Sequence, residues 1–101
     1  MGPFFVYILY SEKHRRSYVG QTNNVDSRLQ QHNMGQVNST KPFRPWVMIH
    51  HEVFNTRSEA MARERWYKTG IGFTRVKELI ALHWKEKQLL HPPKEDARKG
   101  L

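Results

Sequence analysis

Five side chains able to handle a phosphate or a proton lie at separated places in this sequence of 101 residues. Tyr7 and Tyr18 stand at the middle and the start of two short apolar tripeptides, VYI and YVG. Arg28 and His32 are four residues apart, hence neighbours on one helix, where a guanidinium can grip a phosphate with two parallel hydrogen bonds. Glu64 follows 32 residues later, as the one carboxylate of the group.

Glu64 is the residue whose position asks for an explanation. On a helix it falls on the same face as Ala60 and Tyr67, a core-like face where a carboxylate is costly unless it is satisfied. A divalent cation would satisfy it. A basic neighbour on its own helix, Arg63 or Lys68, would also do so.

Two segments rich in aromatic and β-branched residues are expected to position the tyrosines. The run from Phe4 to Tyr10 is apolar on both faces, as in a central strand, and residues 17–22 read as a second strand joined to it by a polar hairpin loop.

If Tyr10 pairs with Ser17 across this hairpin, Tyr7 faces Gly20 and Tyr18 lies on the neighbouring pair. Both phenols then point to one side of the sheet as diagonal neighbours, and Gly20 leaves an open spot beside Tyr7. A slip of one residue would separate the two phenols.

Three helices and a third strand are expected after the hairpin. A first helix is capped within residues 22–24 and ends near residues 33–35, followed by a loop over 36–45 and a strand over about 46–54. Thr56 and Glu59 match a capping box for a second helix that Gly70 closes. Thr74 is expected to cap a third helix, and residues 91–101 to form a flexible C-terminal tail.

The charge of the chain favours a polyanionic partner. Seventeen Lys and Arg against nine Asp and Glu give a formal net charge of +8, and such a field attracts nucleic acid. Solubility alone could also explain the charge. The side chains expected to bind nucleic acid are Arg15, Arg16, Gln21, Lys41, Arg44 and Lys68.

Composition also excludes several classes of protein. Without cysteine the chain has neither disulfides nor thiolate metal sites. No apolar run approaches the roughly 20 residues of a membrane span, and the start lacks the features of a signal peptide. A cytoplasmic domain over residues 1–90 is expected.

The order and spacing of the two tripeptides, Arg28, His32 and Glu64 resemble the GIY-YIG nuclease family, and the segment KTGIG at residues 68–72 is similar to that of its small stand-alone members. The resemblance covers about residues 4–80. It implies an α/β (α+β) fold, with a three-stranded antiparallel sheet flanked by about three helices and the active site on one sheet face.

The same resemblance implies hydrolysis of phosphodiester bonds with one divalent metal ion, Mg²⁺ or Mn²⁺, bound by Glu64 and completed by waters and phosphate oxygens. Arg28 would neutralise charge on the phosphoryl group. Tyr18 would be the general base, although an ordinary phenol has a pKa of about 10, while Tyr7 would position water or phosphate and His32 would support Tyr18.

Two positions depart from the family pattern. Val6 replaces the glycine that opens the first motif, a change that a strand tolerates. Gln21 stands where several of these nucleases carry a lysine, and a neutral amide does not supply that charge.

Taken singly, each residue also has an ordinary structural interpretation. Tyr7 and Tyr18 suit strand packing, Arg28 a solvated helix charge, and His32 a partly buried helix position. His50 and His51 are expected to be structural, because adjacent strand residues point to opposite faces.

Three functions follow from these observations. The first is a structure-selective or weakly specific DNA endonuclease, with DNA repair as a setting and RNA as another substrate; no segment is large enough to be a separate recognition domain, so a protein partner could supply specificity. The second is a non-catalytic nucleic-acid-binding module on the same fold. The third, a basic adaptor for another protein, has no specific feature in its favour.

Overall fold

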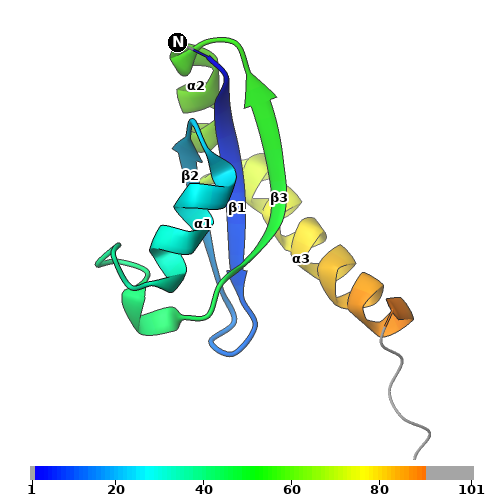
Figure 1. The fold of residues 1–101 in the computed structure, drawn as a ribbon. Helices are drawn as coiled ribbons and strands as arrows, with labels where there is room; N and C mark the ends of the chain where they lie inside the picture. The colour runs from blue at the N-terminus through cyan, green and yellow to red at the C-terminus, as the bar shows by residue number, and fades with distance from the viewer. Residues whose placement is uncertain (1, 91–101) are drawn as a thin grey trace, which may run out of the picture.

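The apolar segment near the N-terminus forms the central strand of the sheet. In the computed structural model, which describes residues 2–90, β1 (Phe4–Ser11) lies between β2 (Arg16–Thr22) and β3 (Val47–Phe54), and both neighbours run antiparallel to it (Figure 1). The expected three-stranded antiparallel sheet is therefore confirmed. Its central strand is buried from Val6 onward, as a run that is apolar on both faces requires.

The hairpin register is the one that brings the tyrosines together. Tyr7 lies opposite Gly20, Leu9 opposite Tyr18 and Tyr10 opposite Ser17. On the other side of β1, the pairing with β3 shifts by one residue between Ile8 and Leu9. The observed hairpin register is thus the one that places both phenols on the same side of the sheet.

Helices cover both faces of this sheet. Figure 1 shows α1 (Val25–Asn33) in front of the sheet and α3 (Gly70–Leu90) behind it, with α2 (Arg57–Tyr67) packed against α3. One core contains Val6, Ile8, Val19, Ala60, Tyr67, Val76 and Leu79, and the other contains Tyr7, Leu9 and Trp46 with Tyr18 and Leu29 against them. Alternate residues of β1 therefore feed two separate cores.

Local capping fixes where the first two helices begin. The Asn24 side chain accepts a hydrogen bond from the backbone N–H of Ser27, and Thr56 with Glu59 forms the predicted capping box. A short 3-10 helix, η1 (Lys41–Phe43), lies within the expected loop.

The third helix begins one turn earlier than expected. It starts at Gly70, so that Thr74 lies inside the helix instead of capping it. The buried Gly72 explains the difference: a Cβ at this residue would collide with the backbone carbonyl of Trp66, so glycine permits the close crossing of α2 and α3. In the sequence, Gly70 and Gly72 look like a break between two helices, whereas Gly72 serves the packing of α3 against α2.

The C-terminal tail expected over residues 91–101 lies outside the described residues. Within residues 2–90, no helix combines the length and the apolar character needed to cross a membrane.

Candidate active site

Tyr7, Arg28 and His32 form one hydrogen-bonded group on the sheet face that α1 covers. Tyr7 and His32 are both fully buried. Arg28 Nε donates to the Tyr7 hydroxyl at 3.3 Å, and this hydroxyl in turn lies 2.9 Å from His32 Nε2. Since Arg28 can only donate, the Tyr7 hydroxyl accepts a hydrogen bond from Arg28 and donates one to His32 Nε2.

The second ring nitrogen of His32 fixes its tautomer. His32 Nδ1 lies 2.8 Å from the Thr40 hydroxyl, which itself donates to the carbonyl of Val37 at 3.3 Å. Nδ1 therefore carries the proton and Nε2 accepts. Burial, together with the positive charge of Arg28, lowers the pKa of His32 to about 4, so the ring is neutral near pH 7.

Tyr7 and Arg28, the two other members of this group, both keep their protons near pH 7. Burial raises the pKa of Tyr7 to about 12, against the lowering effect of its hydrogen bond with Arg28. The hydrogen bond with Tyr7 raises the pKa of Arg28 above its ordinary value. Tyr7 is thus held as a neutral phenol beside a permanent cation.

Tyr18 lies next to this group. Its ring centroid is 5.0 Å from that of His32 and 6.2 Å from that of Tyr7. His32 was expected to support Tyr18, but its hydrogen bond goes to Tyr7 and its contact with Tyr18 is between rings. The reason is that both ring nitrogens of His32 already have partners, Nε2 in the Tyr7 hydroxyl and Nδ1 in the Thr40 hydroxyl.

Gly20 is required by the two tyrosines. A Cβ at this residue would lie 2.6 Å from the Tyr7 oxygen and 3.0 Å from Tyr18 Cε2. The open spot expected beside Tyr7 is therefore filled by the phenols themselves. Because Gly20 has no side chain, the rings of Tyr7 and Tyr18 can pack over it on β2.

Glu64 approaches from the opposite sheet face. Its Oε1 accepts a hydrogen bond from Gln21 Nε2 at 2.9 Å, and its Oε2 accepts from Lys68 Nζ at 2.7 Å. The side chain is 21% exposed, which agrees with the half-buried position inferred from Ala60 and Tyr67. The expected pairing with Lys68 is confirmed, whereas Arg63 instead pairs with Glu52 at 2.8 Å.

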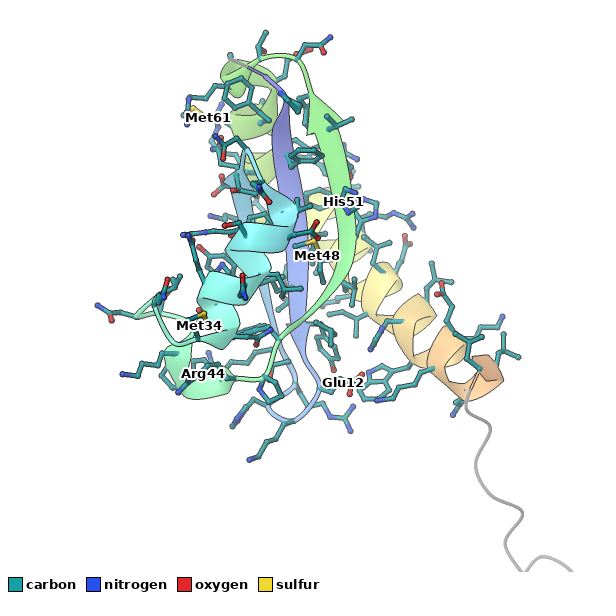
Figure 2. All side chains as sticks on the ribbon, viewed as in Figure 1. Glu12, Met34, Arg44, Met48, His51 and Met61 are labelled. Atoms are coloured by element: carbon teal, nitrogen blue, oxygen red, sulfur yellow. The ribbon has the colours of Figure 1, made fainter. Side chains whose placement is uncertain are left out.

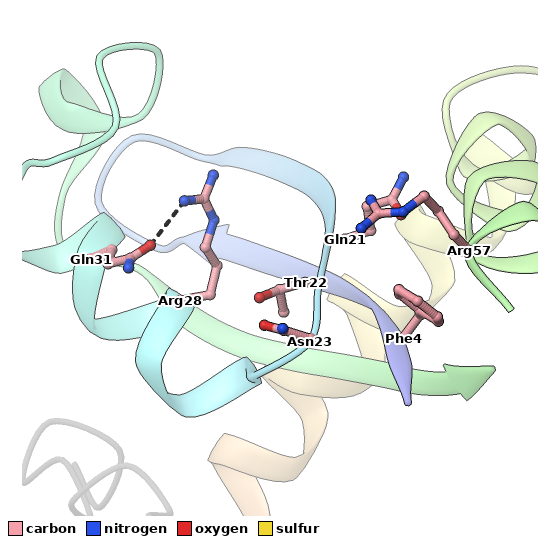
Figure 3. Close-up of a pocket in the computed structure, with 7 residues that line it drawn as sticks. All are labelled: Phe4, Gln21, Thr22, Asn23, Arg28, Gln31 and Arg57. Atoms are coloured by element: carbon pink, nitrogen blue, oxygen red, sulfur yellow. Dashed lines mark hydrogen bonds between the residues drawn. The ribbon is translucent and has the colours of Figure 1, made fainter. Parts of the chain in front are cut away.

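Two hollows are lined by residues of β2, the first together with Arg28 and the second with Tyr18 in its wall. The first, about 340 Å³, is the cleft shown in Figure 3, lined by Phe4, Gln21, Thr22, Asn23, Arg28, Gln31 and Arg57. The second, about 260 Å³, is lined by Tyr18, Lys68 and residues around them. Glu64 bonds to Gln21 of the first hollow and Lys68 of the second, so it lies between the two. β2, which contributes Tyr18 and Gln21, is an edge strand of the sheet.

The atoms around Glu64 suit an ion that keeps much of its own water. Within the described part of the chain, no three His, Asp or Glu side chains converge into a metal site. The Gln21 amide next to Glu64 does offer an oxygen, however. Its Nε2 donates to Glu64, while its Oε1 is buried and has no hydrogen-bond partner. A carboxylate with one amide oxygen fits Mg²⁺ or Mn²⁺, which needs few protein ligands and prefers oxygen.

His50 and Glu52 belong to a separate structural cluster. His50 Nε2 lies 2.7 Å from a Glu52 oxygen, while Arg63 and the Tyr67 hydroxyl also bond to Glu52. These contacts tie α2 to β3. His50 thus has structural contacts, as expected.

The predicted nucleic-acid-binding residues divide into groups. Arg16 lies over the Phe43 ring at 4.1 Å, on the side of η1, and the Arg44 Nε donates to the carbonyl of Lys41. Figure 2 shows Arg44 and Glu12 at one end of the molecule and Met61 at the other. Arg15 turns toward α3 instead, with its guanidinium 4.7 Å from the Trp84 ring. Gln21 and Lys68 lie beside Glu64.

Two residues of this region carried no recognisable signal in the sequence. Thr40 holds the His32 ring, but it lies in a loop whose turn residues gave no indication of burial. Arg57 lines the same cleft as Arg28, and in the sequence it read only as part of the capping box and the general basic surface. Tertiary structure alone brings them to the site.

Comparisons with known proteins identify the family of this chain. Residues 3–73, which include all five candidate residues, match the family described as "GIY-YIG catalytic domain". A UPF0213 protein of Staphylococcus haemolyticus is 40% identical over 80 residues, covering 78% of this chain and 93% of the relative. A UPF0213 protein of Staphylococcus aureus is 38% identical over the same shares.

A solution NMR structure of a UPF0213 protein from Bacillus halodurans is 26% identical, with a TM-score of 0.47 over 80% of this chain and 85% of that one. The family match spans most of the chain, and the staphylococcal relatives are covered over nearly their whole length. The chain therefore belongs to the GIY-YIG family, whose catalytic domains are those of nucleases.

Proposed function

We propose that this chain is a metal-dependent endonuclease that hydrolyses phosphodiester bonds in DNA, with structural or weak sequence selectivity. The observation that carries the proposal is the gathering of two tyrosines, a histidine and an arginine beside a half-buried glutamate around β2. Repair intermediates, such as flaps and branches, are the proposed substrates.

Arg28 and Tyr18 have the two central roles in this proposal. Arg28 is anchored by the Tyr7 hydroxyl and by Gln31 Oε1 at 2.9 Å, so its charge is already oriented toward the cleft where a phosphate would lie. Such preorganised charge is the usual main source of catalysis. Tyr18 would accept a proton from the attacking water, whose oxygen bonds to phosphorus as the bond to the leaving oxygen breaks.

Tyr7 is proposed to orient and not to act as a base. Its pKa of about 12 and its bonds to Arg28 and His32 keep it protonated, so its hydroxyl positions Arg28 and the bound phosphate. Neutral His32 accepts a hydrogen bond from this hydroxyl through Nε2 and so holds the ring in place.

Glu64 and Gln21 are proposed to hold a divalent cation, which supplies Lewis-acid stabilisation of charge on phosphate oxygens. A half-turn of the Gln21 amide exchanges Nε2, now 2.9 Å from Glu64 Oε1, for the unpartnered Oε1. The amide would thus provide an oxygen where other family members carry a lysine.

A cleavage screen tests the proposal. Wild type and Tyr18→Phe are incubated with branched, flapped, single-stranded and duplex DNA, each with Mg²⁺, Mn²⁺ or chelator. Wild type should cut at least one substrate only with metal, and a folded Tyr18→Phe protein should not. Equal cutting by both proteins would indicate a contaminating nuclease.

A second candidate is a nucleic-acid-binding module without catalysis. It is favoured by the bonds of Glu64 to Gln21 and Lys68, which occupy both carboxylate oxygens. This function gives binding that weakens steeply with salt and no cleavage of any substrate in the same screen.

A further inference from the structure

The cleft beside Arg28 contains a second arginine. Arg57 is the first residue of α2, and it lines the same hollow of about 340 Å³ as Arg28. The lining is otherwise made of amides and a hydroxyl, with Phe4 as its apolar member. No carboxylate contributes to it. The cleft is therefore polar and positively charged, as a site for phosphate groups should be.

The Arg57 side chain is held over this cleft. Its guanidinium lies 5.1 Å from the centre of the Phe4 ring, and Figure 3 shows it extending toward Gln21. Among residues 2–90, no acidic side chain forms a salt bridge with it. The capping box immediately before it fixes the start of the helix. Arg57 is thus an oriented cation without a compensating charge in the described part of the chain.

A bound anion would suit its position. A cation in the first turn of a helix faces the positive end of the helix dipole at a cost in free energy, and Glu59, the acidic residue of this turn, bonds to Thr56 and not to Arg57. An anion in the cleft would remove this cost, because it would meet the guanidinium and the positive helix end together. Solubility alone would be served equally well by a cation elsewhere on α2.

The two arginines reach the cleft from different elements. Arg28 comes from α1 on one sheet face and is bonded to Tyr7, next to the proposed reaction centre. Arg57 comes from α2 on the other face and has no bond to that group. A single phosphate can be held by Arg28, whereas a nucleic-acid strand carries phosphates at regular intervals and can offer one to each arginine.

We propose that Arg57 binds a backbone phosphate adjacent to the one being cut, so that the strand runs along the cleft from Arg28 to Arg57. The choice of a nucleic-acid strand rests on the proposed function. The inference adds a phosphate subsite and the direction in which the strand leaves the reaction centre, across the end of β2 toward the start of α2.

Binding of a labelled single-stranded oligonucleotide, measured by fluorescence anisotropy in chelator, tests this subsite without cleavage. Arg57→Gln should weaken binding about tenfold at low salt and reduce the salt slope by about 0.7, the value of one single-strand phosphate contact. Arg65→Gln is the matched control, because it removes the same charge from an exposed position of the same helix outside the cleft. Thermal melts verify that both variants fold.

Oligonucleotides with single neutral methylphosphonates then locate the contact. Wild type should lose affinity when a particular phosphate is neutralised, and Arg57→Gln should be insensitive at that one position. Equal weakening by Arg57→Gln and Arg65→Gln, or an unchanged set of sensitive phosphates in Arg57→Gln, would overturn the assignment. If these binding results appear but no substrate is cut, the proposed nuclease activity fails while the phosphate subsite stands.

Discussion

At the scale of single residues, the site depends on keeping His32 neutral. The ring is fully buried, and its Nε2 accepts a hydrogen bond from the Tyr7 hydroxyl. A protonated imidazole could not accept this hydrogen bond. This gives the fold a dependence on pH. The unfolded chain takes up a proton near the ordinary pKa of about 6.5, whereas the folded chain does so only near the lowered pKa of about 4.

Stability should therefore be constant above about pH 6.5 and fall as the pH decreases toward about 4, because the unfolded state then binds the extra proton. From pH 7 to pH 5 we expect a loss of about 2 kcal/mol in the free energy of unfolding. Urea unfolding at both pH values measures it. His32→Gln should abolish this slope and His51→Gln, at an exposed position, should retain it. An unaltered slope in His32→Gln would contradict the assignment.

Gln21 is the second residue with a specific expectation. If its amide oxygen contributes to cation binding, Gln21→Leu should lower Mn²⁺ affinity about tenfold, the size of effect seen when groups that support a metal site are removed. Titration of Mn²⁺ followed by electron paramagnetic resonance measures the affinity directly. Gln36→Leu, an exposed change outside the site, should have no effect. Undiminished affinity in Gln21→Leu would leave Glu64 as the proposed protein ligand and remove Gln21.

At the scale of elements, the β1–β2 hairpin sets the distance between the tyrosines. Gly20→Ala places a methyl group against the hydroxyl end of buried Tyr7 and the edge of Tyr18. We expect a destabilisation of about 1–3 kcal/mol, as for other overpacked cores, together with loss of cleavage. Chemical unfolding and the cleavage assay measure the two effects. Ser17→Ala, on the same strand, should leave both nearly unchanged, and a Gly20→Ala protein as stable as wild type would show that the tyrosines can move apart.

The sequence was informative for those elements whose signals are local. The apolar run of β1, the polar hairpin loop and the Thr56–Glu59 capping box predicted the strands and the start of α2, whereas the loop length left the hairpin register open. The predicted start of α3 was wrong, because Gly72 is needed for the packing of α3 against Trp66, and in the sequence a glycine at this place looks like the break between two helices.

The same distinction applies to the site. Tyr7, Tyr18, Arg28, His32 and Glu64 could be named from motif and spacing, because each stands at a fixed place on a predictable element. The side chains that contact these residues could not be predicted from the sequence. Thr40 under His32, Gln21 against Glu64 and Arg57 across from Arg28 all depend on how α1 and α2 pack on opposite faces of the sheet.

At the scale of the whole molecule, the net charge of +8 makes binding to nucleic acid sensitive to salt. Besides Arg28 and Arg57, the side chains that contribute should be those on the η1 side, Arg16, Lys41 and Arg44, and not those on α3. Changing these three to Gln should lower the slope of log affinity against log salt by about two, at about 0.7 for each single-strand contact.

The matched control changes Arg65, Lys77 and Lys85 to Gln, which removes the same charge from exposed positions on α2 and α3. Its slope should fall by much less. Equal slopes for the two triple variants would mean that the charge acts as a diffuse field, without a defined path for the strand.

The most direct test of the whole account concerns Glu64, because the proposed chemistry needs its negative charge while the fold does not. Glu64→Gln keeps the size of the side chain, so its melting temperature should stay within a few degrees of wild type. Its rate of cleavage of labelled branched DNA in Mg²⁺ should fall at least about 100-fold, as when a main electrostatic contact of an active site is removed. A folded Glu64→Gln protein that cuts as fast as wild type in Mg²⁺ would contradict the account.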